Sequence, residues 1–123
     1  MSTLYAGERL DHPAIARTLD LDGAIRFAIT GALTHDAASV LGKLVRLDLL
    51  AARGRERGEH RTAFILDLGD CPEITPQALG LLLATSKLVL GELGTLTFDK
   101  VDDDLYDLLV VTKFANVFTL KRS

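Results

Sequence analysis

The chain has 123 residues and a mass of 13.3 kDa, which is the size of one ordinary domain. Apolar residues make up 48% and charged residues 25%, a balance that excludes an intrinsically disordered chain or a coiled coil. The net charge of -3 argues against nucleic-acid binding, because that function needs a basic field around the phosphates.

The first elements that the sequence predicts are a β-hairpin and a helix. Alternating apolar residues on either side of an Asp-Gly turn predict a strand that ends at Asp20 and a second strand over Ala24–Thr30. Gly31 interrupts this pattern, and Thr34 is placed to cap a helix. The apolar stripe of that helix, which we expect to pack on a sheet, consists of Ala37, Val40, Leu41, Leu44, Leu47 and Ala51. Its solvated face carries Ser39, Lys43, Arg46 and Arg53.

A charged loop separates this helix from the most apolar strand of the chain. Residues Arg53–Arg61 include two glycines and no apolar side chain, and we interpret them as a solvated loop rather than a surface that steers an acidic partner. Residues Thr62–Leu68 are almost continuously apolar, which is typical of a central strand covered on both faces. We therefore expect the other elements to pack around this strand.

The second half of the chain begins with its clearest local signal, a Thr-Pro pair at a helix start. Thr75 can occupy the N-cap and Pro76 the first helical position, where a missing N–H costs nothing. The helix is expected to run to Leu90 and to stop at Gly91. A strand over Gly94–Val101 follows it.

Three aspartates and a closing extended segment complete the order of elements. Asp102–Asp104 predict the start of a last helix rather than a metal site, because negative charge in a first turn interacts favourably with the helix dipole. Residues 114–120 are expected to form a short extended segment. The fold class predicted is α/β, with a mixed sheet of four to five strands and helices packed mainly on one side. Residues 1–17 form an N-terminal segment, either a tail or an edge strand, and a single domain covers 18–123.

Few side chains have the setting that catalysis or metal binding requires. The single cysteine, Cys71, cannot form an intramolecular disulfide, and we expect a buried or inert thiol rather than one activated by the helix that follows. The histidines are scattered, so we expect no metal and no cofactor, and solvated or capping roles for His12, His35 and His60. Neither an export signal nor an apolar run of membrane-spanning length occurs, which predicts a cytoplasmic protein without direct membrane insertion.

The helix that begins at Pro76 is apolar on both of its long faces. One face carries Leu79, Leu82, Leu83, Ser86 and Leu90. The other carries Gln77, Gly80, Leu81, Ala84 and Leu88. A helix that is apolar all round is either buried or a docking surface. In a domain this small we expect the face of Leu81, Ala84 and Leu88, which ends at the small residues Ala78 and Gly80, to be a contact patch; the alternative is that a neighbouring helix or the N-terminal segment covers it.

The order and spacing of several sequence blocks resemble the STAS domain, the module shared by anti-sigma factor antagonists, stressosome subunits and the cytoplasmic tails of sulfate transporters. The block FAITGALTHDAASVLGKLV is similar to the family's strand, glycine and first helix, and AFILDLGDCPEIT to its central strand and the loop after it. ALGLLL resembles the second helix and DLLVVTKFANVFTL the closing helix and strand. The resemblance spans residues 18–120.

The resemblance also implies a regulatory position. In antagonists of the family the central strand ends in an Asp, and an Asp-Ser-Ser/Thr-Gly motif opens the second helix; the anti-sigma kinase phosphorylates the second hydroxyl of that motif. Asp67 matches the strand Asp, and Leu79 and Gly80 match the Leu-Gly after the motif. The four motif positions are held here by Thr75, Pro76, Gln77 and Ala78. The acceptor is therefore replaced by the amide of Gln77, which cannot be phosphorylated, and the use of Thr75 or Ser86 instead stays open.

These observations predict a non-catalytic protein–protein interaction module of transcription regulation and signal transduction. It resembles an anti-sigma factor antagonist or stressosome subunit, and its partner would be an anti-sigma factor, a switch kinase or another STAS subunit. The partner-binding residues are expected to be Thr75, Gln77, Ala78, Gly80, Leu81, Ala84 and Leu88. The alternative is an accessory STAS subunit of a membrane transport complex that binds its ATPase, and the same face could also form a homodimer. An enzyme would need a pocket of groups with shifted pKa near Asp67, Cys71 and Glu73, and we expect none.

Overall fold

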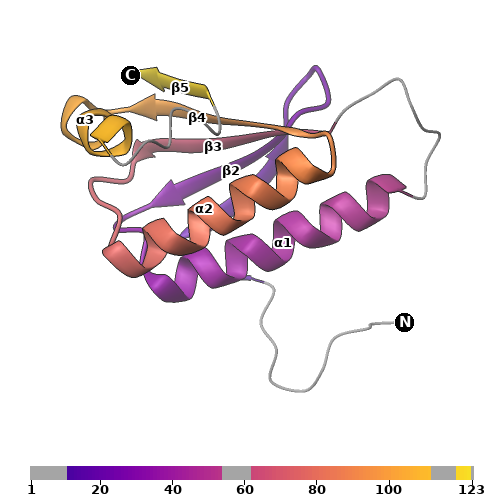
Figure 1. Ribbon diagram of the computed structural model, residues 1–123, viewed down its shortest axis with the longest axis horizontal. Coiled ribbons are helices and arrows are strands. Elements are labelled where there is room, and N and C mark those ends of the chain that lie inside the picture. Colours follow the sequence, from indigo (N-terminus) through magenta and orange to yellow (C-terminus); the bar gives the residue numbers. More distant parts are fainter. Residues whose placement is uncertain (1–10, 54–61, 112–118, 123) are drawn as a thin grey trace.

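The computed structural model describes residues 11–53, 62–111 and 119–122 (Figure 1). Within these ranges the chain forms five strands and three helices: β1 (Ile15–Leu19), β2 (Ile25–Thr30), α1 (His35–Arg53), β3 (Ala63–Asp70), α2 (Pro76–Gly91), β4 (Thr95–Val101), α3 (Asp103–Val111) and β5 (Thr119–Arg122). None of the helices in these ranges has the length and apolar character that crossing a bilayer requires.

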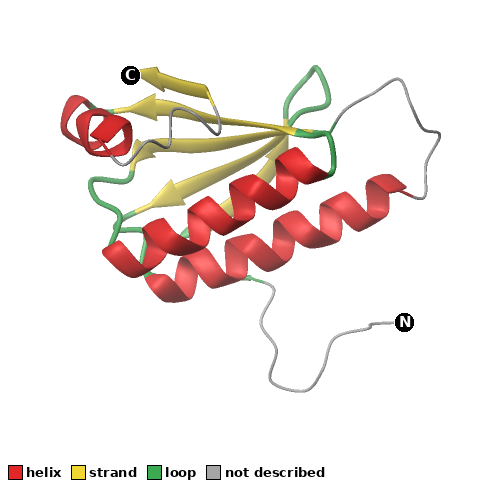
Figure 2. Cartoon of the chain, viewed as in Figure 1, coloured by secondary structure: helices red, strands yellow, loops and turns green. Residues whose placement is uncertain are grey.

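The strands form one mixed sheet in the order β1-β2-β3-β4-β5. β1 pairs antiparallel with β2, and every later pair is parallel. The connections from β2 to β3 and from β3 to β4 therefore cross the sheet, and they do so through α1 and α2. These two helices lie side by side and run in the same direction along one face of the sheet (Figure 2). The predicted α/β class, a mixed sheet with helices mainly on one side, is confirmed.

The predicted hairpin forms around the Asp-Gly turn. Leu19 pairs with Ile25, and between them the N–H of Asp20 donates to the carbonyl of Ala24 at 2.8 Å. Gly23 adopts a φ of 90°, a left-handed conformation that is unfavourable for a residue with a Cβ. The glycine therefore fixes the turn and, through it, the pairing register of β1 with β2.

The first helix begins where the sequence predicts, but its buried stripe is rotated. Thr34 caps α1, its hydroxyl accepting from the N–H of Ala37 at 3.4 Å. Leu47 is 40% exposed and Ala51 is exposed too, so their predicted place in the stripe is wrong. The predicted Ala37, Val40 and Leu41 are buried, and the stripe is completed by Ala38, Val45 and Leu49, which lie on the side of the helix that faces the core.

The central strand is β3, as predicted, but only one of its faces is fully buried. Burial alternates along it: Phe64, Leu66 and Leu68 are buried, whereas Ile65 and Asp67 are only half-buried. The prediction of a strand covered on both faces is therefore wrong for the described part of the chain. α1 and α2 cover one face, and the other face is open enough to carry charged side chains.

The hydrophobic core lies between the sheet and the helices. Its largest members come from the three central strands, and the rings of Phe27 and Phe64 stack with centroids 6.3 Å apart. α3 contributes Leu105 and Leu109 to the same core. It starts at the predicted aspartates, where Asp102 caps it by accepting from the N–H of Leu105 at 2.8 Å.

Two predicted segments fall largely outside the described residues. They are the charged loop 53–61, of which only Arg53 is described, and the closing extended segment 114–120, of which only its last two residues are described. The described end of that segment belongs to β5, which pairs parallel with β4 at the edge of the sheet. The N-terminal segment 1–17 is described from residue 11 onward, and β1 begins at Ile15.

Candidate interaction site

The start of α2 is built by a local cap and a tie to the start of α1. Thr75 has extended backbone angles, and its hydroxyl accepts from the N–H of Ala78 at 3.2 Å, with Pro76 in the first turn. The predicted Thr-Pro start is confirmed. The N–H of Thr75 also donates to the carbonyl of Leu33 at 3.0 Å, and Leu33 forms a bridge with Ile74. The two helices are therefore held together at their N-terminal ends.

The two long faces of α2 have different surroundings. The face toward the sheet is buried and consists of Ala78, Leu82, Thr85, Ser86 and Val89. The outer face carries the exposed residues Gln77, Gly80 and Ala84 and the half-buried residues Leu81 and Leu88. Among the expected partner-binding residues, Ala78 has an exposed fraction of 0% and offers no surface to a partner. The others share the outer face or, like Thr75, lie half-buried at its beginning.

The outer face of α2 forms one wall of a groove whose other wall is α1. We call it the α1–α2 groove; it has a volume of about 540 Å³ and is lined by Ala38, Ser39, Gly42, Lys43, Arg46, Leu81, Ala84, Thr85, Lys87 and Leu88. The helices approach closely at Gly42, where a Cβ would lie 3.2 Å from the hydroxyl of Thr85. α1 therefore lies beside the patch of Leu81, Ala84 and Leu88 and leaves it accessible from the groove.

The charges of the groove all have one sign. Lys43 and Arg46 come from α1 and Lys87 from α2, and no acidic side chain is among the lining residues that the structure describes. Arg46 and Lys87 are exposed. The groove thus combines apolar and small side chains with basic ones on both helices, in a chain whose net charge is -3.

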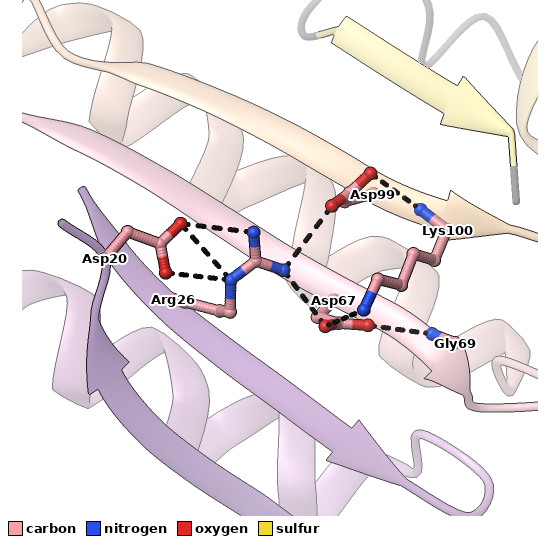
Figure 3. A network of polar contacts seen from close by, with 6 residues as sticks. All are labelled: Asp20, Arg26, Asp67, Gly69, Asp99 and Lys100. Carbon is pink, nitrogen blue, oxygen red and sulfur yellow. Dashed lines mark hydrogen bonds and ion pairs between the residues drawn. The ribbon is translucent and has the colours of Figure 1, made fainter. Parts of the chain in front are cut away.

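A second group of charged residues lies on the face of the sheet turned away from α1 and α2 (Figure 3). Arg26 of β2 lies at its centre. Its Nε donates to Asp20 at 3.0 Å, one terminal nitrogen also donates to Asp20 at 3.1 Å, and the other donates to Asp67 at 3.0 Å and Asp99 at 3.4 Å. We call Asp20, Arg26, Asp67, Asp99 and Lys100 the Arg26 cluster. It joins three neighbouring strands and the hairpin turn.

The surroundings of Asp67 and Arg26 in the cluster favour the charged form of both side chains. Burial pushes the pKa of Asp67 upward, but the N–H of Gly69 at 3.0 Å, the ammonium of Lys100 at 3.4 Å and Arg26 outweigh it, and the pKa lies below its usual range. The hydrogen bonds that Arg26 donates to Asp20, together with those to Asp67 and Asp99, outweigh desolvation and raise the pKa of Arg26. Arg26 and Asp67 therefore form an ion pair at neutral pH.

The structure does not bring Asp67 together with the start of α2. Asp67 contacts Arg26, Lys100 and the N–H of Gly69, none of which belongs to α2, and its side chain points to the opposite side of the sheet. Sequence reasoning missed Arg26, Asp20, Asp99 and Lys100. The available signal was the alternation of apolar and polar residues along the predicted strands. Because successive side chains of a strand point to opposite faces, this alternation puts Arg26, Asp67 and Asp99 on one face of a sheet.

The residues considered for catalysis do not converge. Cys71 is buried, as predicted, its thiol donates to the carbonyl of Glu73 at 3.3 Å, and burial raises its pKa. The side chain of His12 is 15% exposed, its Nε2 lies 3.0 Å from a carboxylate oxygen of Asp36, and its Nδ1 accepts from the N–H of Ala14. His35 is exposed at the start of α1, and His60 lies outside the described residues. No group of His, Cys, Asp and Glu in the described ranges is arranged to hold a metal ion.

Two solved structures share this arrangement of strands and helices. One is a candidate anti-sigma factor antagonist from Thermotoga maritima, with a TM-score of 0.70, 14% sequence identity and coverage of 89% of this chain and 86% of the other. The other is the anti-sigma factor antagonist SpoIIAA in its unphosphorylated form, with a TM-score of 0.64, 11% identity and coverage of 89% and 88%. The fold is that of a STAS-like domain. No protein-family model and no curated protein matches the sequence.

Residues 75–78, which the sequence resemblance aligns with the phosphorylation motif of antagonists, lie at the start of α2. Thr75 to Ala78 form the cap and first turn of α2, as the resemblance implies for the phosphorylation motif of antagonists. Gln77 is exposed there, so an amide stands on the surface where the motif would carry a hydroxyl. The outer face of α2 continues from this turn into the α1–α2 groove.

Proposed function

We propose that this chain is a non-catalytic protein-interaction module that acts as an anti-sigma factor antagonist or stressosome subunit does, in the cytoplasm. Its partner is an anti-sigma factor, a switch kinase or another STAS subunit. The observation that carries the proposal is the outer face of α2, where Ala84 is exposed and where Leu81 and Leu88, which pack partly against the core, also line a groove. The likeness of the fold to two antagonist structures supports it.

We also propose that binding at this face is not switched by phosphorylation at the start of α2. Gln77 has no hydroxyl, the hydroxyl of Thr75 serves the helix cap, and Ser86 is fully buried with its hydroxyl donating to the carbonyl of Leu82 at 2.8 Å. A phosphate would add about -1.5 to -2 charges to the docking surface. Without one, the surface keeps a single charge state.

The binding proposal is tested by calorimetric titration of the purified chain with purified candidates from its own genome: anti-sigma factors, switch kinases, STAS proteins and transport ATPases. We expect at least one of the first three classes to bind. The double variant Ala84→Gln with Leu88→Gln is expected to weaken that binding at least tenfold, because it makes the outer face polar without adding charge. Leu90→Gln is the matched control, since Leu90 lies on the same helix, is 45% exposed and does not line the groove.

Three results would overturn the binding proposal. They are that no candidate of the three classes binds, that the double variant binds as the native chain does, or that only a transport ATPase binds. The phosphorylation proposal is tested separately by incubating the chain with the kinase that binds it and ATP, followed by intact-mass spectrometry. The expected mass is unchanged, and stoichiometric phosphate within residues 75–86 would contradict the proposal.

A further inference from the structure

We propose that the α1–α2 groove binds an amphipathic helix of the partner whose apolar face is bordered by glutamate or aspartate side chains. This inference deepens the proposed function and rests on it: it names the chemistry of the segment that the outer face of α2 recognises. It follows from the shape of the groove, from the side chains along its floor and from the sign of its charges.

The shape and floor of the groove suit a helix. α1 and α2 run side by side in the same direction (Figure 1), and residues of both helices line the groove between them. Its lining residues extend from Ala38 to Arg46 on α1 and from Leu81 to Leu88 on α2. At 1.5 Å per residue this is roughly 11–12 Å, or about two helical turns. Ala84 is exposed in the groove, and its small side chain leaves room for an approaching backbone, as in other cases where an apolar helix face lies in a groove.

The basic side chains of the groove determine which residues can flank the apolar face of the bound helix. Arg46 and Lys87 stand on different walls, so a helix lying between them would have one basic side chain on each side. Acidic residues flanking its apolar face would pair with both, whereas basic residues would be repelled. Charges at the rim of an interface act mainly on association rate and on the choice between partners. The groove therefore accepts apolar helices in general and prefers acidic ones.

The same features argue against two other occupants. In a two-fold dimer the same surface of each copy meets itself. A second copy bound through this groove would therefore place Arg46 and Lys87 of one copy against the same basic residues of the other, which repel them. A nucleic acid would meet apolar side chains and no aromatic side chain on which a base can stack, in a chain of net charge -3. An acidic amphipathic helix would bury its apolar face against the apolar side chains of the groove and pair its carboxylates with Arg46 and Lys87.

The test uses two synthetic peptides of about 18 residues, or five helical turns. Both have the same leucine and alanine face; one carries glutamate at the flanking positions and the other lysine. Each is titrated into the isotope-labelled chain and followed by amide chemical shifts. We expect the glutamate peptide to bind at least tenfold more tightly and to shift amides of the α1–α2 groove. Arg46→Gln with Lys87→Gln is expected to remove most of that preference.

A matched control separates the groove charges from net charge. Lys121→Gln with Arg122→Gln removes the same two positive charges from β5, outside the groove, and is expected to keep the preference. The inference is overturned if the peptides bind equally, if the shifts map to the open sheet face, if a single-stranded oligonucleotide displaces the glutamate peptide, or if the chain dimerises through the groove in sedimentation experiments.

The inference and the proposed function can fail independently. If the natural partner binds Arg46→Gln with Lys87→Gln as it binds the native chain but loses affinity for Ala84→Gln with Leu88→Gln, the function stands and the acidic helix is wrong. If no candidate partner binds at all while the glutamate peptide binds in the groove, the groove chemistry stands and the proposed class of partner is wrong.

Discussion

Basic side chains occupy two regions of this molecule in opposite circumstances. In the Arg26 cluster one guanidinium lies within 3.0–3.4 Å of three aspartates that come from the hairpin turn and two neighbouring strands. In the α1–α2 groove, Arg46 and Lys87 are exposed beside apolar side chains, and no acidic residue is among the described residues that line the same surface. The first arrangement is complete within the chain, whereas we propose that an acidic helix of a partner completes the second.

This difference separates charges that stabilise the fold from charges that we propose to bind a partner. The side chain of Arg26 is 22% exposed and that of Asp67 is 14% exposed, so removing one member leaves its neighbours poorly solvated and unpaired. Exposed charges such as Arg46 are well solvated whether or not they are paired, and they contribute little to stability. Stability measurements should therefore respond to the cluster, and binding measurements to the groove.

The largest effect is expected from Arg26→Leu. The substitution leaves three aspartates facing one another with Lys100 as their remaining cation in the cluster, and we expect a loss of about 2–4 kcal/mol in the free energy of unfolding, measured with urea. Arg46→Leu is the matched control because it makes the same chemical change in the groove, where we expect a change within about 0.5 kcal/mol. Equal effects of the two variants would show that the distinction between the regions is wrong.

A smaller and pH-dependent effect is expected from Asp67→Asn. The pKa of Asp67 is lowered in the folded chain, so its stabilisation is present above the unfolded pKa of about 3.9 and is lost as the pH falls toward the folded pKa. We expect the variant to lose about 1–2 kcal/mol at neutral pH, a difference from the native chain that shrinks below about pH 4. The measurement is urea unfolding of both chains across this range. A difference that does not depend on pH would contradict the assignment of the effect to this carboxylate.

A third and smaller loss of stability is expected from replacing Asp99, whose contacts in the cluster are weaker than those of Asp67. Asp99 lies 3.4 Å from Arg26 and accepts from the backbone N–H of Lys100 at 3.0 Å, whereas Asp67 lies 3.0 Å from Arg26 and also forms an ion pair with the ammonium of Lys100. Asp99→Asn is therefore expected to cost about 0.5–1 kcal/mol, less than Asp67→Asn. Thermal unfolding of both variants at neutral pH gives the order, and the reverse order would mean that these distances do not decide the energetics.

Local signals predicted the elements of the fold because their chemistry depends on neighbours in the sequence. The Thr75 cap and the Gly23 turn need only residues within a few positions, and both form as expected. The Arg26 cluster could not be predicted in the same way. Its members are brought together by the register of parallel strands, which places Ala28 opposite Asp67 and Asp67 opposite Asp99 after crossovers through α1 and α2.

The candidate site was predicted only in part, again for a physical reason. α2 is apolar on both faces, so periodicity does not say which face the sheet buries. The rotation of the helix against the sheet decides that Ala78 is buried and that Ala84 is exposed. The basic side chains of the groove depend in addition on how α1 packs beside α2, where Gly42 lies close to Thr85.

The smallest effect on stability, and the sharpest test of the comparison, is expected from Arg46→Gln with Lys87→Gln. Among the described residues neither Arg46 nor Lys87 has a polar partner that the replacement would leave unpaired, and glutamine is about as good a helix former as arginine and lysine. The free energy of unfolding should therefore change by no more than about 0.5 kcal/mol.

The salt dependence of peptide binding tests the same two side chains. In the native chain, the affinity for the glutamate-flanked peptide should fall as salt is raised from about 0.05 to 0.5 M, because added salt weakens the attraction between exposed charges. The variant should show a weaker salt dependence. A loss of stability as large as that of Asp67→Asn would place the groove charges in the fold, and the contrast between the two regions would no longer hold.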